Sequence, residues 1–67
     1  MDASIQNLIA AYNACAIAIK DQSISNEKRA KLLTCIKNIG YTIKIMCNAV
    51  GLSYTINDDT WTISAVQ

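Results

Sequence analysis

The strongest constraint on the fold is an apolar repeat that runs through a glycine. From Leu32 onward, apolar residues recur at intervals of four, three, four, three and four, without a shift at Gly40. This period places them on one face of an α-helix. Ser25 suits the N-cap, and Gly51 followed by Leu52 is typical of a left-handed helix end. The pattern predicts one helix over about residues 26–50, with a stripe of Leu32, Ile36, Ile39, Ile43, Met46 and Val50.

A second interpretation of the same stretch stays open. In the segment YTIKI, residues 41–45, β-forming residues alternate with Thr42 and Lys44 as they do in a strand. A shorter helix would then end at Gly40, and a three-stranded antiparallel meander would follow. The helical repeat spans six positions and the alternation only three, so we favour the long helix. Glycine inside a helix costs about 1 kcal/mol relative to alanine, which predicts a close crossing with another helix at Gly40.

An earlier helix is predicted over about residues 3–20, with Asp2 or Ser4 as its cap. Its main apolar stripe has a spacing of three, four, three and four and contains Ile5, Leu8, Tyr12, Cys15 and Ile19. A second apolar line, through Ala3, Ala10, Ala14 and Ile17, leaves only a narrow polar side. One short chain supplies few elements to cover both sides. We therefore expect a homo-oligomer, a dimer in the simplest case, with Ala10, Ala14 and Ile17 at or near the contact.

The remaining segment reads as a β-hairpin with strands at about residues 53–57 and 60–64. A turn at Asp58 and Asp59 pairs Ile56 with Trp61 and places the apolar side chains on one face. Asp-Asp is a weaker turn than Asn-Gly, so a longer loop stays open. The hairpin edge is a second candidate contact between copies. The fold class is thus an α+β miniprotein, a single small domain over residues 1–67, whose predicted core comprises Ile5, Leu8, Tyr12, Cys15, Ile19, Leu32, Ile36, Ile39, Ile43, Met46, Val50, Ile56, Trp61 and Ile63.

Four of the six basic residues gather around the turn between the predicted helices. Lys20, Lys28, Arg29 and Lys31 could bind an anion, nucleotide or nucleic acid, with Tyr41 as a stacking platform. Short basic clusters are more often solvated surface, and a lone surface tyrosine is ordinary. Because cations are unfavourable near a helix N-terminus, replacing Lys28 and Arg29 with glutamate is expected to leave the stability unchanged or slightly higher.

Several function classes lack support in the sequence. The chain has no histidine and three well-separated cysteines, Cys15, Cys35 and Cys47, so a zinc site within one chain is not expected. The cysteines read as reduced core thiols of a cytoplasmic protein, and an intermolecular disulfide is the alternative. The apolar run Ile9–Ile19 is too short to span a bilayer. A net charge of +1 argues against a dedicated nucleic-acid binder.

Catalysis is not expected either. Adjacent Asp58 and Asp59 diverge rather than converge on a substrate, and the chain has no glycine-rich phosphate loop. No cofactor or metal is expected. A composition that is 52% hydrophobic is high for so small a chain and indicates a surface that meets a partner. The sequence favours a non-enzymatic protein-interaction module, an inhibitor or adaptor of the kind that phages and mobile elements carry as small accessory proteins, and the anion binder is the alternative.

Overall fold

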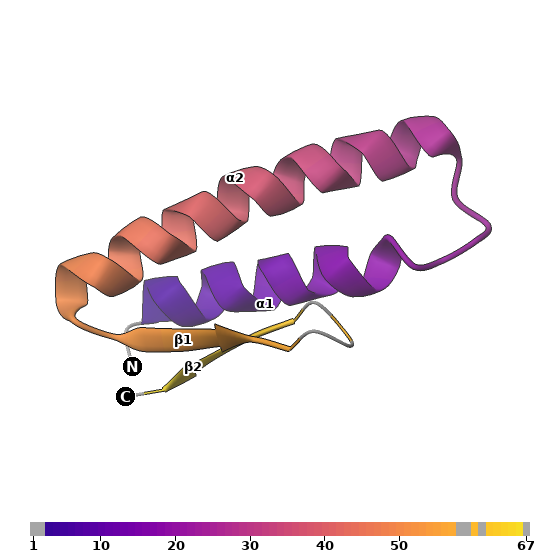
Figure 1. Cartoon of the computed structure of the whole chain (residues 1–67). Coiled ribbons are helices and arrows are strands. Elements are labelled where there is room, and N and C mark those ends of the chain that lie inside the picture. The colour runs from indigo at the N-terminus through magenta and orange to yellow at the C-terminus, as the bar shows by residue number, and fades with distance from the viewer. Residues whose placement is uncertain (1–2, 58–59, 61, 67) are drawn as a thin grey trace.

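Two helices are followed by two strands (Figure 1) in the computed structural model, which describes residues 3–57, 60 and 62–66. Helices α1 (Ala3–Ala18) and α2 (Asn26–Val50) run side by side in opposite directions. Strands β1 (Ser53–Ile56) and β2 (Ile63–Val66) form an antiparallel hairpin that packs against the helices. This arrangement confirms the predicted helical hairpin with a C-terminal β-hairpin. The alternative in which a strand begins after Gly40 is wrong, because α2 continues to Val50.

The C-terminal end of α2 is built as its sequence predicts. Gly51 adopts a left-handed backbone with φ 71°, which a residue with a side chain rarely does. The N–H of Leu52 donates to the carbonyl of Cys47 at 2.8 Å, and the N–H of Gly51 donates to that of Asn48 at 3.3 Å. These two bonds make a Schellman motif. Leu52 then packs against the core, so the cap aims the chain into β1.

The other helix ends lie at the interhelical turn. Ser25 is the N-cap of α2, where its hydroxyl accepts a hydrogen bond from the N–H of Lys28 at 3.2 Å. Helix α1 ends at Ala18, two residues before the predicted position 20. The N–H of Lys20 donates to the carbonyl of Ile17 at 3.2 Å, three residues back, so the chain tightens and leaves the α-helical path.

The core is smaller than predicted. Of the predicted residues, Ile5, Tyr12, Ile19, Ile43 and Ile63 are buried, whereas Leu8, Cys15, Leu32, Ile36, Ile39 and Met46 are half-buried. Ala16, which was not predicted to lie in the core, is buried, and so is Cys47, which was predicted as a core thiol. Val50 and Ile56 were predicted to be buried but are 61% and 51% exposed. Trp61 lies outside the described residues.

A rotation of α2 explains much of this difference. At about 100° per residue, the fully buried Ile43 and Cys47 point about 40° away from the middle of the predicted stripe, toward Gly40. There the ring of Tyr12 fills the space that glycine leaves: a Cβ at position 40 would come 3.2 Å from its Cε2 atom. The predicted close crossing is present, with an aromatic ring as the contact.

The hairpin register differs from the prediction by two residues. Ile56 pairs with Ile63 rather than Trp61, and Tyr54 pairs with Ala65. A longer loop replaces the two-residue turn, and the N–H of Asn57 donates to the carbonyl of Thr62 at 2.8 Å beside it. The Asp-Asp pair lacks the glycine that tight hairpin turns favour. A shift of two residues leaves each side chain on the same face of the strand. The predicted assignment of residues to the two faces is therefore unaffected by the error in register.

A pair of hydrogen bonds joins α1 to the hairpin. The Asn13 side chain accepts from the N–H of Ile63 at 2.7 Å and donates to the carbonyl of Ile63 at 3.1 Å. The carboxamide thus meets β2 as a neighbouring strand would. Polar side chains on a helix usually face water, whereas that of Asn13 faces β2. Hence the second covered side of α1 is the side that carries Asn13, not the line through Ala10 and Ala14.

Candidate interaction surface and basic end

Helix α1 has an exposed apolar side that neither α2 nor the hairpin covers. Its outer face, defined here as Ala10, Ala14 and Ile17, is exposed throughout, and the side chain of Ile17 is 64% exposed. All 16 residues of α1 are uncharged. A surface helix normally carries charged residues on the side that faces water. The three residues predicted as an oligomer contact therefore lie together on an exposed apolar surface.

Large apolar side chains are exposed on the other elements as well. Besides Ile17, the exposed set comprises Leu33, Tyr41, Ile45, Val50 and Ile56. Single exposed apolar residues are normal. Six such side chains among the described residues accord with the high apolar content of the chain.

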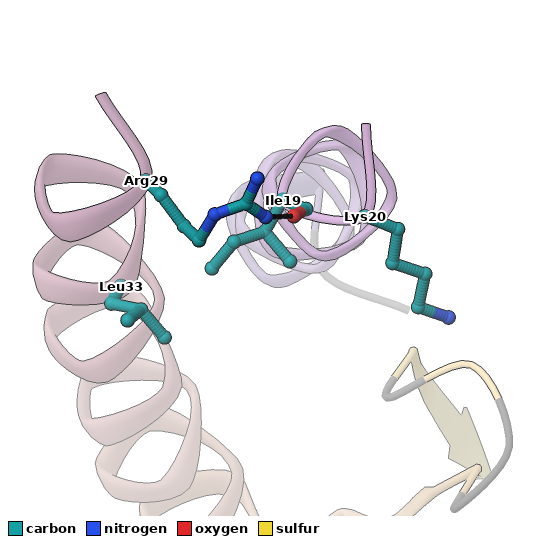
Figure 2. A pocket seen from close by; sticks show the side chains of 4 residues that line it. All are labelled: Ile19, Lys20, Arg29 and Leu33. Atoms are coloured by element: carbon teal, nitrogen blue, oxygen red, sulfur yellow. Dashed lines mark hydrogen bonds between the residues drawn. The ribbon is translucent and has the colours of Figure 1, made fainter. Parts of the chain in front are cut away.

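Arg29 has a structural role that the sequence did not reveal. Its guanidinium reaches from α2 to the end of α1 and donates to the carbonyl of Ile19 (Figure 2). A second nitrogen donates to the carbonyl of Asp21 at 3.2 Å. The carbonyl of Ile19 directly follows the end of α1, where carbonyl groups lack intrahelical partners and the helix dipole is negative. Arg29 therefore caps α1 and ties it to α2.

The other basic side chains are held in different directions. Lys20 points away from Arg29 toward the hairpin loop, where its Nζ donates to the carbonyl of Thr60 at 3.0 Å (Figure 2). The Nζ of Lys31 lies 3.5 Å from Glu27 Oε1, one helical turn earlier on α2. Lys28 is exposed. The four basic residues share one end of the molecule, but three of them already contact oxygen atoms of the chain.

The basic residues at this end of the molecule line two different open hollows. The first has a volume of about 360 Å³ and is lined by Ile19, Lys20, Arg29 and Leu33 (Figure 2). The second, of about 290 Å³, is lined by Ile24, Lys28, Lys31, Leu32 and Cys35. Both have almost entirely apolar walls, with the basic residues among their lining side chains.

Tyr41 does not join the basic end. It is 65% exposed on α2. The 12 positions that separate it from Arg29 correspond to about 18 Å along a helix. The structure therefore brings Lys20, Lys28, Arg29 and Lys31 to one end and leaves the proposed stacking residue apart from them.

The interhelical turn contains a titrating group with an ordered environment. The Ser23 hydroxyl and main-chain N–H donate to Asp21 Oδ1 at 2.7 and 2.9 Å. These hydrogen bonds, aided by the nearby charge of Arg29, hold the pKa of Asp21 below its ordinary value of 3.8. The turn thus favours the ionised carboxylate.

The cysteines differ in exposure and are all free thiols. Cys47 is buried, Cys15 is half-buried and Cys35 is exposed, so the prediction of three core cysteines is wrong for Cys35. Among residues 3–57, 60 and 62–66, no three cysteine, aspartate or glutamate side chains gather in a group that could hold a metal ion. Neither helix, over the described residues, is long and apolar enough to cross a membrane.

Comparison with known proteins adds no relative. No family model matches the chain, and no curated protein or solved structure is significantly similar to it.

Sequence reasoning missed two residues that organise these surfaces. Asn13 was visible as one polar residue inside an apolar run, which is a signal for a buried polar partner. Arg29 was grouped with neighbouring lysines by charge alone. The guanidinium group carries several N–H donors in one plane, which lysine does not. This difference could have indicated that Arg29 binds two carbonyl groups.

Proposed function

We propose that this protein is a non-enzymatic protein-interaction module, of the inhibitor or adaptor kind, that self-associates through the outer face of α1. The observation that carries the proposal is the uncharged helix α1 with Ile17 64% exposed on its uncovered side. Burying that face removes apolar surface from water. The alanines at positions 10 and 14 allow another backbone to approach closely. The three free thiols suit a reducing compartment such as the cytoplasm.

The mass of the protein in solution tests this proposal. Sedimentation equilibrium from low to high micromolar concentration is expected to show a homo-oligomer, of at least the dimer mass, for the unmodified chain. Ile17→Asp places a charge on the outer face of α1 and is expected to weaken the dimer at least tenfold, because an unpaired charge at an interface is costly. Ile45→Asp is the matched control, since Ile45 is 50% exposed but lies on α2.

Two results would contradict the proposal. If the protein is a monomer at high micromolar concentration, the proposed self-association is wrong. If Ile17→Asp leaves the oligomer intact, the contact does not lie on the outer face of α1.

A second candidate function is the binding of an anionic small ligand, nucleotide or nucleic acid at the basic end. The observation that favours it is the hollow of about 360 Å³ whose apolar wall lies beside Lys20 and Arg29. It ranks second because both side chains already donate to main-chain oxygens. Salt dependence separates the two functions: phosphate binding weakens steeply as salt rises, whereas an apolar contact does not.

A further inference from the structure

Strand β1 has one edge paired with β2 and one edge that has no strand neighbour in the described part of the chain. The bond from the Asn57 N–H to the Thr62 carbonyl identifies these residues as a hydrogen-bonded pair. Such pairs alternate with non-bonded pairs in an antiparallel ladder. Thr55 and Ser64 are therefore the next bonded pair. It follows that the N–H and C=O groups of Tyr54 and Ile56 point away from β2.

The other edge of the hairpin is already occupied in part. By the same alternation, the main-chain groups of Ile63 point away from β1, and the Asn13 side chain binds both of them. This contact places α1 beside β2. The outer edge of β1 consequently lies on the side of the hairpin away from Asn13, and no third strand pairs with it within residues 3–57, 60 and 62–66.

The helix-facing side of β1 is also incompletely covered. Tyr54 and Ile56 lie two residues apart and share a face of the strand. Tyr54 packs against the core, but Ile56 is 51% exposed. The strand sequence, SYTI, has no charged residue and no proline. Proteins commonly protect a free strand edge with such residues, and this edge lacks them.

We propose that the outer edge of β1 pairs antiparallel with the same edge of a second copy, about a two-fold axis at Thr55. Tyr54 then lies opposite the partner's Ile56, and Ile56 lies opposite the partner's Tyr54. Each pair exchanges two main-chain hydrogen bonds. The two hairpins form one sheet in the order β2–β1–β1–β2. This contact rests on the proposed self-association but uses a surface different from the outer face of α1, so copies that make both contacts assemble beyond a dimer.

The edge is self-complementary, which is why a second copy is the partner that fits it. The two residues with outward main-chain groups flank Thr55 symmetrically, so one two-fold operation satisfies all of them. The partner's Tyr54 ring also reaches the exposed side of Ile56, an aromatic and β-branched pair that is favourable across strands. Thr55 meets the partner's Thr55 in the closer, non-bonded type of pair.

A charge exchange at Thr55 tests this register. Its side chain is exposed on the face away from the helices, so substitutions there leave the core contacts in place. Thr55→Lys and Thr55→Glu each place like charges opposite each other in the homodimer. Each variant alone is expected to dimerise roughly threefold to tenfold more weakly than the unmodified chain at low salt. An equimolar mixture is expected to form the mixed dimer in excess of the statistical share, as native mass spectrometry measures.

Ser64→Lys and Ser64→Glu are the matched controls. Ser64 is exposed and pairs with Thr55 within the chain, so it lies one strand further from the axis. Its variants are expected to keep the dimerisation constant of the unmodified protein. Far-UV circular dichroism checks that every variant is folded. If the Thr55 variants do not fold, amide exchange of the unmodified chain replaces them: the Tyr54 and Ile56 amides are expected to exchange more slowly as concentration rises.

Three results would overturn the inference. The Thr55 homodimers could be as tight as the unmodified dimer, the mixture could be statistical, or the Tyr54 and Ile56 amides could exchange independently of concentration. If Ile17→Asp dissociates the dimer while the Thr55 variants behave as the unmodified chain, only the β1 contact fails. If the unmodified chain is a monomer, the proposed function fails with it.

Discussion

Gly40 of α2 lies directly against the ring of Tyr12 in α1, at a distance where a Cβ atom would come 3.2 Å from Tyr12 Cε2. A side chain at position 40 must therefore displace a ring that is only 9% exposed. Interiors are close-packed, so such a displacement passes to neighbouring residues. The glycine weakens the helix locally but sets how closely the two helices approach.

Gly40→Leu is expected to lower the free energy of unfolding by about 1–3 kcal/mol. Leucine has a higher helix propensity than glycine, which by itself would raise the stability. The sign of the change in unfolding free energy therefore shows whether the clash with Tyr12 or the helix propensity dominates. Urea denaturation followed by circular dichroism measures it. Ala49→Leu on the exposed part of α2 is the control and should stay within about 0.5 kcal/mol of the unmodified protein. A more stable Gly40→Leu protein would show that the Tyr12 contact does not limit the crossing.

Asn13→Leu is expected to destabilise the fold by about 1–3 kcal/mol, because the N–H and C=O of Ile63 both lose their partner. Amide exchange should become faster at Ile63 and remain slow in the middle of α2. Asn7→Leu is the control, since Asn7 is exposed on the same helix. Equal effects of the two substitutions would argue against the hydrogen bonds as the cause.

Lys28 and Arg29 are expected to respond in opposite directions to glutamate. Lys28→Glu should raise the stability by a few tenths of a kcal/mol, because an acid suits the first turn of α2. Arg29→Glu should lower it by about 1–3 kcal/mol, because the carbonyls of Ile19 and Asp21 lose their donor. The sequence alone predicted no loss from the double substitution, and the structure changes that expectation for Arg29. Thermal unfolding of the two single variants measures the difference, which equal melting temperatures would refute.

Asp21 is expected to add an acid-sensitive contribution to stability. Its folded-state pKa lies below the ordinary 3.8, so its contribution is present above that value and is lost as the pH falls through the lower folded pKa. Melting temperatures at pH 6 and pH 3 measure the loss. Asp21→Asn should show a smaller decrease between the two pH values. A decrease as large as that of the unmodified chain would assign the acid sensitivity to other carboxyl groups.

The elements were predictable because each depends on local signals. The apolar repeat and the Gly51 cap predicted the length of α2, and alternation predicted a hairpin with the first strand in place, whereas the second strand begins at Ile63 rather than at residue 60. The rotation of α2 was not predictable, because it depends on where the Tyr12 ring lies in three dimensions. The register error has a similar cause: the turn was judged from Asp58 and Asp59 alone, whereas Asn13 also binds Ile63 from a distant helix.

The candidate surface was predictable only where the residue type and spacing along the helix determine it. Ala10, Ala14 and Ile17 share a helix face by their spacing alone, and the structure leaves that face uncovered. The basic end was only partly predictable. Counting charges places four residues near one turn but does not show that Arg29 binds main-chain carbonyls.

The contact between Asn13 and Ile63 joins residues 50 positions apart. We therefore expect it to form late in the folding of the chain. The helical hairpin and the β-hairpin each close over short loops, whereas bringing residue 13 to residue 63 orders a loop whose entropic cost is about 1–1.5 kcal/mol greater than for a ten-residue loop. An isolated two-stranded hairpin is marginal in water, so docking onto α1 is expected to come last. Before that step the outer edge of β2 is open at Ile63. During refolding, the chain concentration then decides whether Asn13 or a strand from another molecule reaches this position first.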